Sequence, residues 1–336
     1  MQDLAVYITT TRSNYYLCKA LIASLEQFAR RPAIYILPED SYAKDAMFGY
    51  PVWRPQDPRV LALNYYYTKL RIFWGPAERF LYLDADVLAL KDLLPLTEFI
   101  EAHKAPFVAV YDVADHVKLW RDAGQAVRDE IHTRWVGDVD KIRRFDPGYV
   151  FPEIMPFETG FFCASRDAVN HEAFLDTFER AARFNSSKGE VSALTRPRKA
   201  LFNQADMGFL NYFLSSQKIG AERLEDAVLW GGNRSRFERR DQLQGPLTGL
   251  FCHWSGCARP GPWPIRLARV PGQREWRKQY IAFCKSRNDW RGGGKDLVED
   301  LARCARQRCS SAKQFVARRL GRRNSAAASS GPEKTA

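Results

Sequence analysis

The sequence has no stretch of 18 or more apolar residues, so it predicts no membrane-spanning helix. Its first residues, MQDLAVYITT, enter a strand-like run at once, without the basic, apolar and cleavage segments of a secretory signal. The seven cysteines are odd in number and form no regular framework, which favours reduced thiols. We therefore expect a cytoplasmic protein, either soluble or peripheral on the inner face of the cytoplasmic membrane.

Acidic residues are nearly absent from residues 303–336, which hold nine basic residues and one acidic residue, a charge of +8. The 336-residue chain carries +12, so residues 1–302 carry only +4. A nearly balanced body with a basic tail argues against a protein that binds nucleic acid over its whole surface. The chain is 46% hydrophobic, enough for one large domain or a domain with an appendage.

Short apolar runs without any internal repeat predict strands at 4–9, 33–37, 79–83, 106–112, 159–165 and 248–254. Helical spacing predicts helices at 14–28, 60–75, 167–184, 200–214 and 273–287. A strand, a helix and a strand within the first 37 residues favour an α/β fold with a Rossmann-like, mostly parallel sheet and flanking helices. Residues 113–156 show little periodicity and are interpreted as an insertion or lid.

The C-terminal part of the sequence predicts an appendage to a main domain at 1–290. RGGG at 291–294 is interpreted as a hinge, 291–323 as a basic amphipathic helix centred on 296–320, and 324–336 as a disordered tail. A basic amphipathic helix favours an anionic membrane surface, here through 296–323. The alternative is a solvated helix that packs on the body through Phe315 and Leu320.

Two carboxylates follow the apolar run FLYL, in the segment RFLYLDADVL at 79–88. Side chains at i and i+2 of a strand share a face, so Asp84 and Asp86 should project together near the carboxyl edge of the sheet. Ligands bind at that edge in open α/β folds. Oxygen ligands of this kind favour Mg²⁺ or Mn²⁺, and the alternative is a solvated turn.

A second polar cluster occurs in FCHWSGCARPGPW at 251–263. His253 follows an apolar strand and can complete a carboxylate site. Gly256 lets a phosphate approach the backbone, and Arg259 can neutralise it. Two alternatives remain, a hydrogen-bonded core histidine and a zinc site of Cys252, His253 and Cys257, whose spacing is unlike common zinc modules.

Lys69 lies among aromatic residues in YYYTKLRIFW, on the predicted helix before the carboxylates. A lysine in such surroundings can reach a diphosphate, and the alternative is a solvated charge.

The ordered segments ITTTRSNYYLCKALIASL, YTKLRIFW, FLYLDADVL, FETGFF, DMGFLN and HWSGCARP resemble the family-8 glycosyltransferases. That family includes glycogenin, plant galactinol synthases and bacterial lipopolysaccharide glycosyltransferases, and the resemblance spans roughly residues 4–264. It implies a GT-A fold, a UDP-sugar donor, Mn²⁺ (or Mg²⁺) and transfer with retention of anomeric configuration.

Site residues follow from this resemblance position by position. It implies that the metal ligands are Asp84, Asp86 and His253. It implies that the donor-binding residues are Thr9, Thr11, Tyr16, Lys69, Asp84, Ala85, Gly256 and Arg259. It implies catalytic roles beside the sugar for Asp206, Glu158 and Gln204. Met207 stands where the family often has Gln, and Glu158 stands where the family usually has Asn, so Gln204 is considered as a substitute for the missing amide.

These observations predict a metal-dependent retaining hexosyltransferase that moves a hexose from a UDP-sugar to a glycan or lipid-linked glycan. The expected acceptor is a bacterial cell-surface polysaccharide or lipopolysaccharide. The first alternative is transfer to a protein, a polyol or a storage glycan. The second is a nucleotide-sugar-binding protein without catalysis, which the departures at Glu158 and Met207 leave open. We do not expect nucleic acid as a partner.

Overall fold

The computed structural model describes residues 5–11, 14–28, 32–38, 46–102, 105–110, 120, 122–152, 156–186, 200–223, 250–253, 271–298, 301–302 and 305. The predicted tail at 324–336 and most of the predicted basic helix lie outside these residues. Within the described part of the chain, no helix is both long and apolar enough to cross a membrane. The four cysteines in this part, Cys18, Cys163, Cys252 and Cys284, are buried free thiols.

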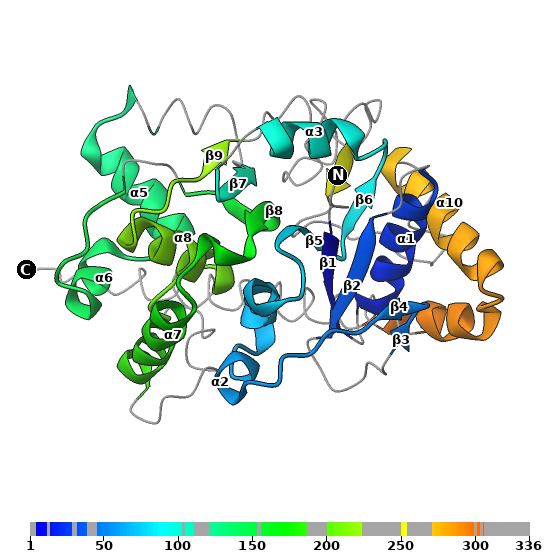
Figure 1. Cartoon of the computed structure of the whole chain (residues 1–336), viewed down its shortest axis with the longest axis horizontal. Coiled ribbons are helices and arrows are strands. Elements are labelled where there is room, and N and C mark those ends of the chain that lie inside the picture. The colour runs from blue at the N-terminus through cyan, green and yellow to red at the C-terminus, as the bar shows by residue number, and fades with distance from the viewer. Residues whose placement is uncertain are drawn as a thin grey trace, which may run out of the picture.

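A six-stranded sheet in the order β2-β1-β5-β8-β7-β9 forms the centre of the molecule (Figure 1). Its strands are β1 Ala5–Thr10, β2 Ala33–Pro38, β5 Arg79–Asp84, β7 Phe107–Val110, β8 Glu158–Ser165 and β9 Glu222–Arg223. The β1–β2, β1–β5 and β7–β9 pairs are parallel, while β8 is antiparallel to β5 and β7. The mostly parallel α/β sheet is confirmed, and the reversed direction of β8 was not predicted.

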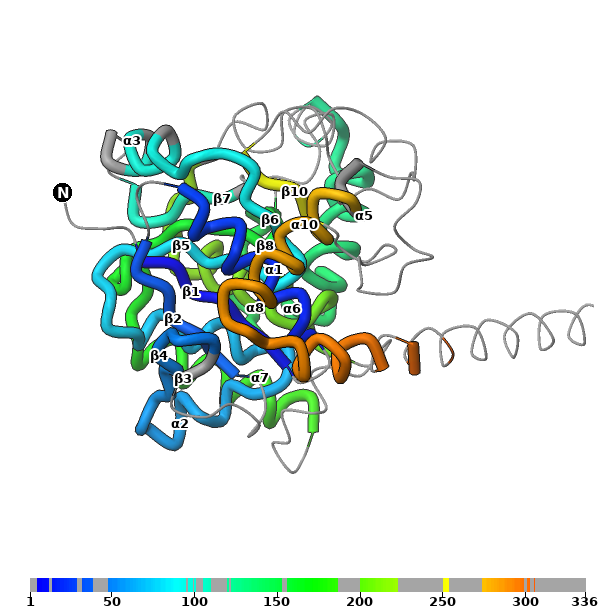
Figure 2. The backbone as a smooth tube through the Cα atoms, turned by 90° about the vertical axis from the view of Figure 1, so that its right-hand side faces the viewer, coloured from blue at the N-terminus to red at the C-terminus, as the bar shows by residue number. Residues whose placement is uncertain are grey.

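Helices cover both faces of this sheet. The remaining elements are α1 Tyr15–Glu26, β3 Ala46–Met47, β4 Tyr50–Pro51, α2 Pro58–Leu61, the 3₁₀ helix η2 Tyr65–Trp74, β6 Val87–Ala89, α3 Leu94–Ala102, α5 Gln125–Trp135, α6 Val139–Phe145, the 3₁₀ turn η3 Arg166–Ala168, α7 His171–Asn185, α8 Asp206–Ser216, β10 Phe251–His253 and α10 Pro271–Ser286. Figure 2 shows α1 and α10 packed together over one face. The helices α7 and α8 lie on the other side of the molecule in Figure 1.

Alternation along β1 divides the core into two layers. Val6 and Ile8 are buried with α1 and α10, whereas Tyr7 is buried with η2, α7 and α8. Successive side chains of a strand point to opposite faces, so a continuously apolar strand is what a sheet covered on both faces requires. The apolar runs in the sequence therefore placed these strands correctly.

Three segments differ from their predictions. The helix predicted at 60–75 is the short α2 followed by η2, because Asn64 is extended and Tyr65 takes a φ of 54° between them. The predicted insertion at 113–156 contains α5 and α6, whose amphipathic signal is weak in the sequence. Residues 291–294, predicted to be a hinge, are helical within the segment 290–298. The domain boundary at 290 stays a prediction.

A buried histidine joins α5 to the chain that follows α6. His132 has no exposed surface, and its ring nitrogens lie 2.9 Å from Gly137 O and 2.7 Å from the Tyr149 hydroxyl. Burial lowers the pKa of His132 to about 4, only partly opposed by the hydrogen bond to the Gly137 carbonyl. The folded protein therefore keeps this imidazole neutral where an exposed histidine takes up a proton.

We expect the free energy of unfolding to decrease as the pH is lowered from about 6.5 to about 4, because of His132. In this window the unfolded chain binds a proton that the folded chain refuses, so stability rises with pH. The shift from 6.5 to about 4 corresponds to roughly 3 kcal/mol at most. Urea unfolding at a series of pH values would measure this, and His132→Gln should flatten the dependence. An equally steep dependence in the variant would contradict the assignment.

Candidate active site

The two carboxylates lie at the end of β5 and in the tight turn that follows it. Asp84 is the last residue of β5, Ala85 and Asp86 form the turn, and β6 begins at Val87. The strand periodicity that predicted a shared face does not apply across a turn, so the turn itself brings the two side chains together. Ala85, a predicted donor contact, is buried in that turn with 6% exposed.

His253 reaches the same place from a strand distant in the sequence, 167 residues after Asp86. The short strand β10 pairs antiparallel with β6, which sets His253 opposite Val87, the residue after Asp86. One ligand atom from each of Asp84, Asp86 and His253 can be chosen so that all three lie within 4.8 Å of one another. The structure thus brings the predicted metal ligands together, and their role as ligands stays a prediction.

The imidazole of His253 lies between two carboxylates. Its Nε2 is 3.3 Å from Asp86 Oδ1, and its Nδ1 is 3.5 Å from Glu158 Oε1. Burial alone would lower the pKa of His253, but the Asp86 carboxylate, helped by Glu158 and Asp84, raises it. Glu158, predicted to be catalytic, therefore lies behind the imidazole, where an acidic partner can orient a ligating histidine.

Gly160 forms the wall of the cluster on β8. A Cβ atom at this position would lie 2.6 Å from His253 Cε1, 3.2 Å from His253 Nε2 and 3.1 Å from Asp84 Oδ2. Any other residue at this position would displace the imidazole of His253 and the carboxylate of Asp84 from their present positions. The absence of a side chain at Gly160 thus lets two of the candidate ligands, His253 and Asp84, pack directly against β8.

Lys69 lies within the carboxylate cluster, in the middle of η2. Its Nζ is 3.1 Å from both Asp84 Oδ1 and Asp206 Oδ2, and donates to the Thr159 carbonyl oxygen at 3.3 Å. Burial would lower the pKa of Lys69, but the Asp206 and Asp84 carboxylates together raise it. The lysine is therefore a fixed positive charge beside the candidate metal ligands rather than a solvated one.

Asp206 is the first residue of α8 and has 6% exposed. Its Oδ2 accepts a hydrogen bond from Thr159 Oγ1 at 2.7 Å. Burial raises the pKa of Asp206, while Lys69 and Thr159 oppose the rise. The two residues before it, Gln204 and Ala205, take positive φ values of 55° and 50°, conformations that cost free energy and often persist at functional sites.

A chain of hydroxyl groups holds Asp84 from the sheet side. The Tyr82 hydroxyl donates to Asp84 Oδ1 at 2.5 Å and lies 2.6 Å from Thr9 Oγ1. Thr9, a predicted donor contact, has 4% exposed and supports Tyr82, and its role at the donor stays a prediction. Sequence reasoning missed Tyr82, Thr159 and Gly160. The signal for Tyr82 was its strand spacing, two residues before Asp84, which puts both side chains on one face.

The remaining predicted site residues make other contacts in the structure or lie outside the described residues. Tyr16 has 1% exposed and packs edge-on against Trp276 at 5.8 Å between ring centroids, and its role as a donor contact stays a prediction. Thr11 Oγ1 accepts from the Asn14 backbone N–H at 3.1 Å, at the start of α1. Gln204 is exposed, and no contact within the described part of the chain joins it to the carboxylates. Gly256 and Arg259 lie outside the described residues.

The positions of Cys252 and His253 on β10 argue against the zinc alternative. Cys252 has 1% exposed and packs in the core layer with α1 and α10, while His253 belongs to the carboxylate cluster. Adjacent strand residues point to opposite faces, so Cys252 and His253 do not converge. Cys257 lies outside the described residues. The described ligand atoms are carboxylate oxygens and one imidazole, a set that suits Mn²⁺ or Mg²⁺ better than a thiolate zinc site.

Comparison by sequence finds no matching family model and no matching curated protein. Comparison by structure finds the galactosyltransferase LgtC in complex with donor and acceptor sugar analogs, with a TM-score of 0.52 and 14% identity over 86% of this chain and 100% of that chain. The glycosyltransferase GlyE of Streptococcus pneumoniae TIGR4 gives 0.47 and 14% identity over 88% of this chain, which spans 64% of GlyE. The likeness to LgtC shows that the chain has the GT-A type of α/β fold.

Proposed function

We propose that the protein is a metal-dependent retaining glycosyltransferase that moves a hexose from a UDP-sugar to a glycan acceptor. The observation that carries the proposal is the cluster at the end of β5, where Asp84, Asp86 and His253 converge beside Lys69 in a GT-A fold. LgtC, which shares that fold, is a galactosyltransferase crystallised with donor and acceptor sugar analogs. We propose the same classes of donor and acceptor, a sugar donor and a sugar acceptor, for this chain.

The charge of the cluster supports a bound cation. Four carboxylates, Asp84, Asp86, Glu158 and Asp206, face one ammonium and one imidazole among the described residues. Carboxylates this close repel one another unless a positive charge lies between them. Asp84, Asp86 and His253 would hold Mn²⁺ or Mg²⁺, which as a Lewis acid stabilises negative charge on a diphosphate leaving group.

The residues around the candidate metal ligands have separate roles in the proposed reaction. Lys69 would shift from Asp84 toward the diphosphate and add fixed positive charge where the glycosidic bond breaks. Asp206, held by Thr159, would bind hydroxyl groups of the donor sugar. The next residue, Met207, is 7% exposed and has no acidic or nucleophilic group. The proposal therefore has the acceptor oxygen bond to the anomeric carbon on the face from which the diphosphate leaves, while the acceptor proton passes to the departing phosphate. Attack on that face retains the anomeric configuration.

A bacterial cell-surface polysaccharide or lipopolysaccharide is the acceptor we propose, and a protein, a polyol or a storage glycan is the alternative. The anionic membrane partner of residues 296–323 also stays a prediction, since most of that segment lies outside the described residues.

Release of UDP from a panel of UDP-sugars tests the proposal. We expect release from one donor with Mn²⁺, none with EDTA, and a loss on the order of 100-fold or more in Asp86→Ala, because one ligand of the metal is removed. Asp167→Ala is the matched control, since its carboxylate is exposed on η3 and, among the described residues, pairs only with Arg166. Release that survives both EDTA and Asp86→Ala would contradict the metal site. Tight binding of a UDP-sugar without release would favour the non-catalytic alternative.

A further inference from the structure

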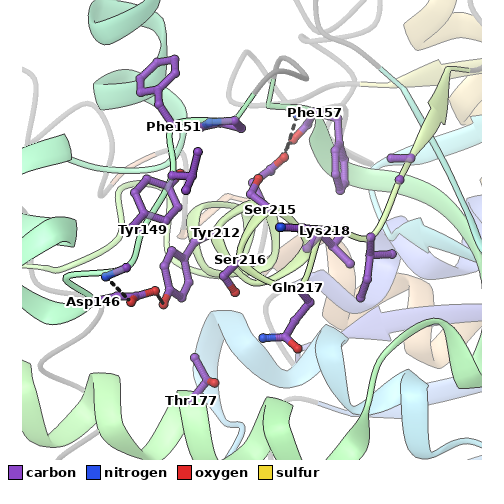
Figure 3. Close-up of a pocket in the computed structure, with 18 of the residues that line it drawn as sticks. Asp146, Tyr149, Phe151, Phe157, Thr177, Tyr212, Ser215, Ser216, Gln217 and Lys218 are labelled. Carbon is purple, nitrogen blue, oxygen red and sulfur yellow. Dashed lines mark hydrogen bonds between the residues drawn. The ribbon is translucent and has the colours of Figure 1, made fainter.

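A cavity of about 780 Å³ lies at the far end of α8 from Asp206 (Figure 3). The loop 146–152, α7 and the residues that end α8 and follow it form its walls. The cavity extends along α8 from Asn211, five residues after Asp206, to the C-terminal end of the helix, so its nearest wall is roughly 8 Å along the helix from Asp206. This volume lies within the range of sites that bind small molecules.

The loop that forms one wall is held in place by its own contacts. Asp146 Oδ2 accepts from the Tyr212 hydroxyl at 2.7 Å, and Asp146 Oδ1 accepts from the Gly148 backbone N–H at 3.2 Å. The Tyr149 hydroxyl meets His132 Nε2 at 2.7 Å, and its ring lies 5.4 Å from that of Tyr212. The cavity is therefore preformed, with aromatic rings fixed on one side, as Figure 3 shows for Tyr149 and Tyr212.

The opposite side of the cavity is polar. Thr177 and Arg180 of α7 and Ser215, Gln217 and Lys218 at the end of α8 line it. Gln217 and Lys218 are exposed, and neither side chain bonds another described residue, so both can meet a ligand. A lipid chain would remove these groups from water without pairing them, which costs free energy.

The side chains of the cavity indicate the class of ligand. Arg180 and Lys218 bring positive charge and Asp146 brings negative charge. The last carbonyl groups of α8 already accept from the backbone N–H groups of Gln217, Lys218 and Ile219, so the helix end does not exclude an anionic group. A saccharide has an apolar ring face for the aromatic wall and hydroxyl groups for the amide of Gln217 and the charged side chains.

The cavity and the carboxylate cluster share two elements. Asn211 of α8 holds both the N–H and the C=O of Phe157 at 2.9 Å, and Phe157 lines the cavity directly before Glu158. The same helix begins at Asp206 in the cluster. We infer that this cavity binds an oligosaccharide segment of the acceptor, remote from the sugar that reacts, an inference that rests on the proposed function.

Binding of the full chain to a microarray of structurally defined bacterial and storage oligosaccharides, in EDTA and without donor, tests this inference. We expect at least one oligosaccharide to bind, and Gln217→Trp to weaken it on the order of tenfold or more by filling the cavity mouth. Gln217→Ala, a milder change, should weaken it about threefold to tenfold through one lost hydrogen bond. Gln125→Trp, on an exposed position of α5 outside the cavity, should bind as the wild type does.

The variants also separate this inference from the proposed function. Gln217→Trp should keep metal-dependent UDP release in the absence of acceptor, and Asp86→Ala should keep oligosaccharide binding. If no oligosaccharide binds, or if both Gln217 variants bind normally, the inference is wrong. Loss of binding in Asp86→Ala would assign the oligosaccharide to the carboxylate cluster instead. If UDP release fails while oligosaccharide binding depends on Gln217, the cavity is a saccharide site and the proposed reaction is wrong.

Discussion

Gly160→Ala should weaken Mn²⁺ binding by roughly 10–100-fold, because the new methyl group would displace the candidate ligands His253 and Asp84. Its Cβ would lie 2.6 Å from His253 Cε1, a separation that real Cβ contacts do not reach, so the imidazole must turn away. Asp84 Oδ2, at 3.1 Å, would also have to move. Titration of the free protein with Mn²⁺, followed by electron paramagnetic resonance of the aquo ion, measures this change without any substrate.

Gly220→Ala is the matched control for that experiment, since a Cβ at Gly220 meets nothing within 4 Å. It should leave Mn²⁺ binding unchanged. UDP release should fall with metal binding in Gly160→Ala if the same ion serves the reaction. Unchanged Mn²⁺ affinity in Gly160→Ala would place the metal elsewhere or remove it from the proposal, whatever the activity of the variant.

Local signals in the sequence were sufficient to predict the main secondary-structure elements and part of the candidate site. The run FLYL before two carboxylates predicted a buried strand that ends at a polar edge, and β5 ends at Asp84. Strand spacing also linked Tyr82 to Asp84, although that link was not drawn. The fold was predictable because the central strands β1, β5 and β8 are apolar on both faces.

The contacts within the site could not be predicted in the same way. His253 meets Asp86 only because β10 pairs with β6 in one particular register, and pairing partners distant in sequence leave no local signal. Lys69 reaches Asp206 from a 3₁₀ helix, where the sequence predicted an α-helix with a different angular spacing. The hydrogen bond between the hydroxyl groups of Thr9 and Tyr82 joins two strands that are distant in sequence, so it too leaves no local signal.

The contacts of Lys19 in α1 could not be predicted from the sequence either, although its charge interrupts an apolar run. Its side chain has no exposed surface, and its Nζ lies 2.6 Å from Asp289 Oδ2 and 2.7 Å from Asp296 Oδ2. Tyr280 of α10 also donates to Asp296 Oδ2 at 2.7 Å. These contacts fix the segment 290–298 against α1, which explains why the predicted hinge at 291–294 is helical instead.

Lys19→Ala should reduce the free energy of unfolding by about 3–5 kcal/mol, because it leaves two carboxylates near the core without their cation. The triple variant Lys19→Met, Asp289→Asn, Asp296→Asn removes every charge of the cluster and should recover most of that loss. Arg59→Ala is the control, since Arg59 also binds carboxylates but at the surface of α7, where solvent screens them. Chemical denaturation of the four proteins measures the differences. If Lys19→Ala costs no more than Arg59→Ala, the ion pairs do not hold the C-terminal segment, and a truncation at 295 would then leave the body as stable as the full chain.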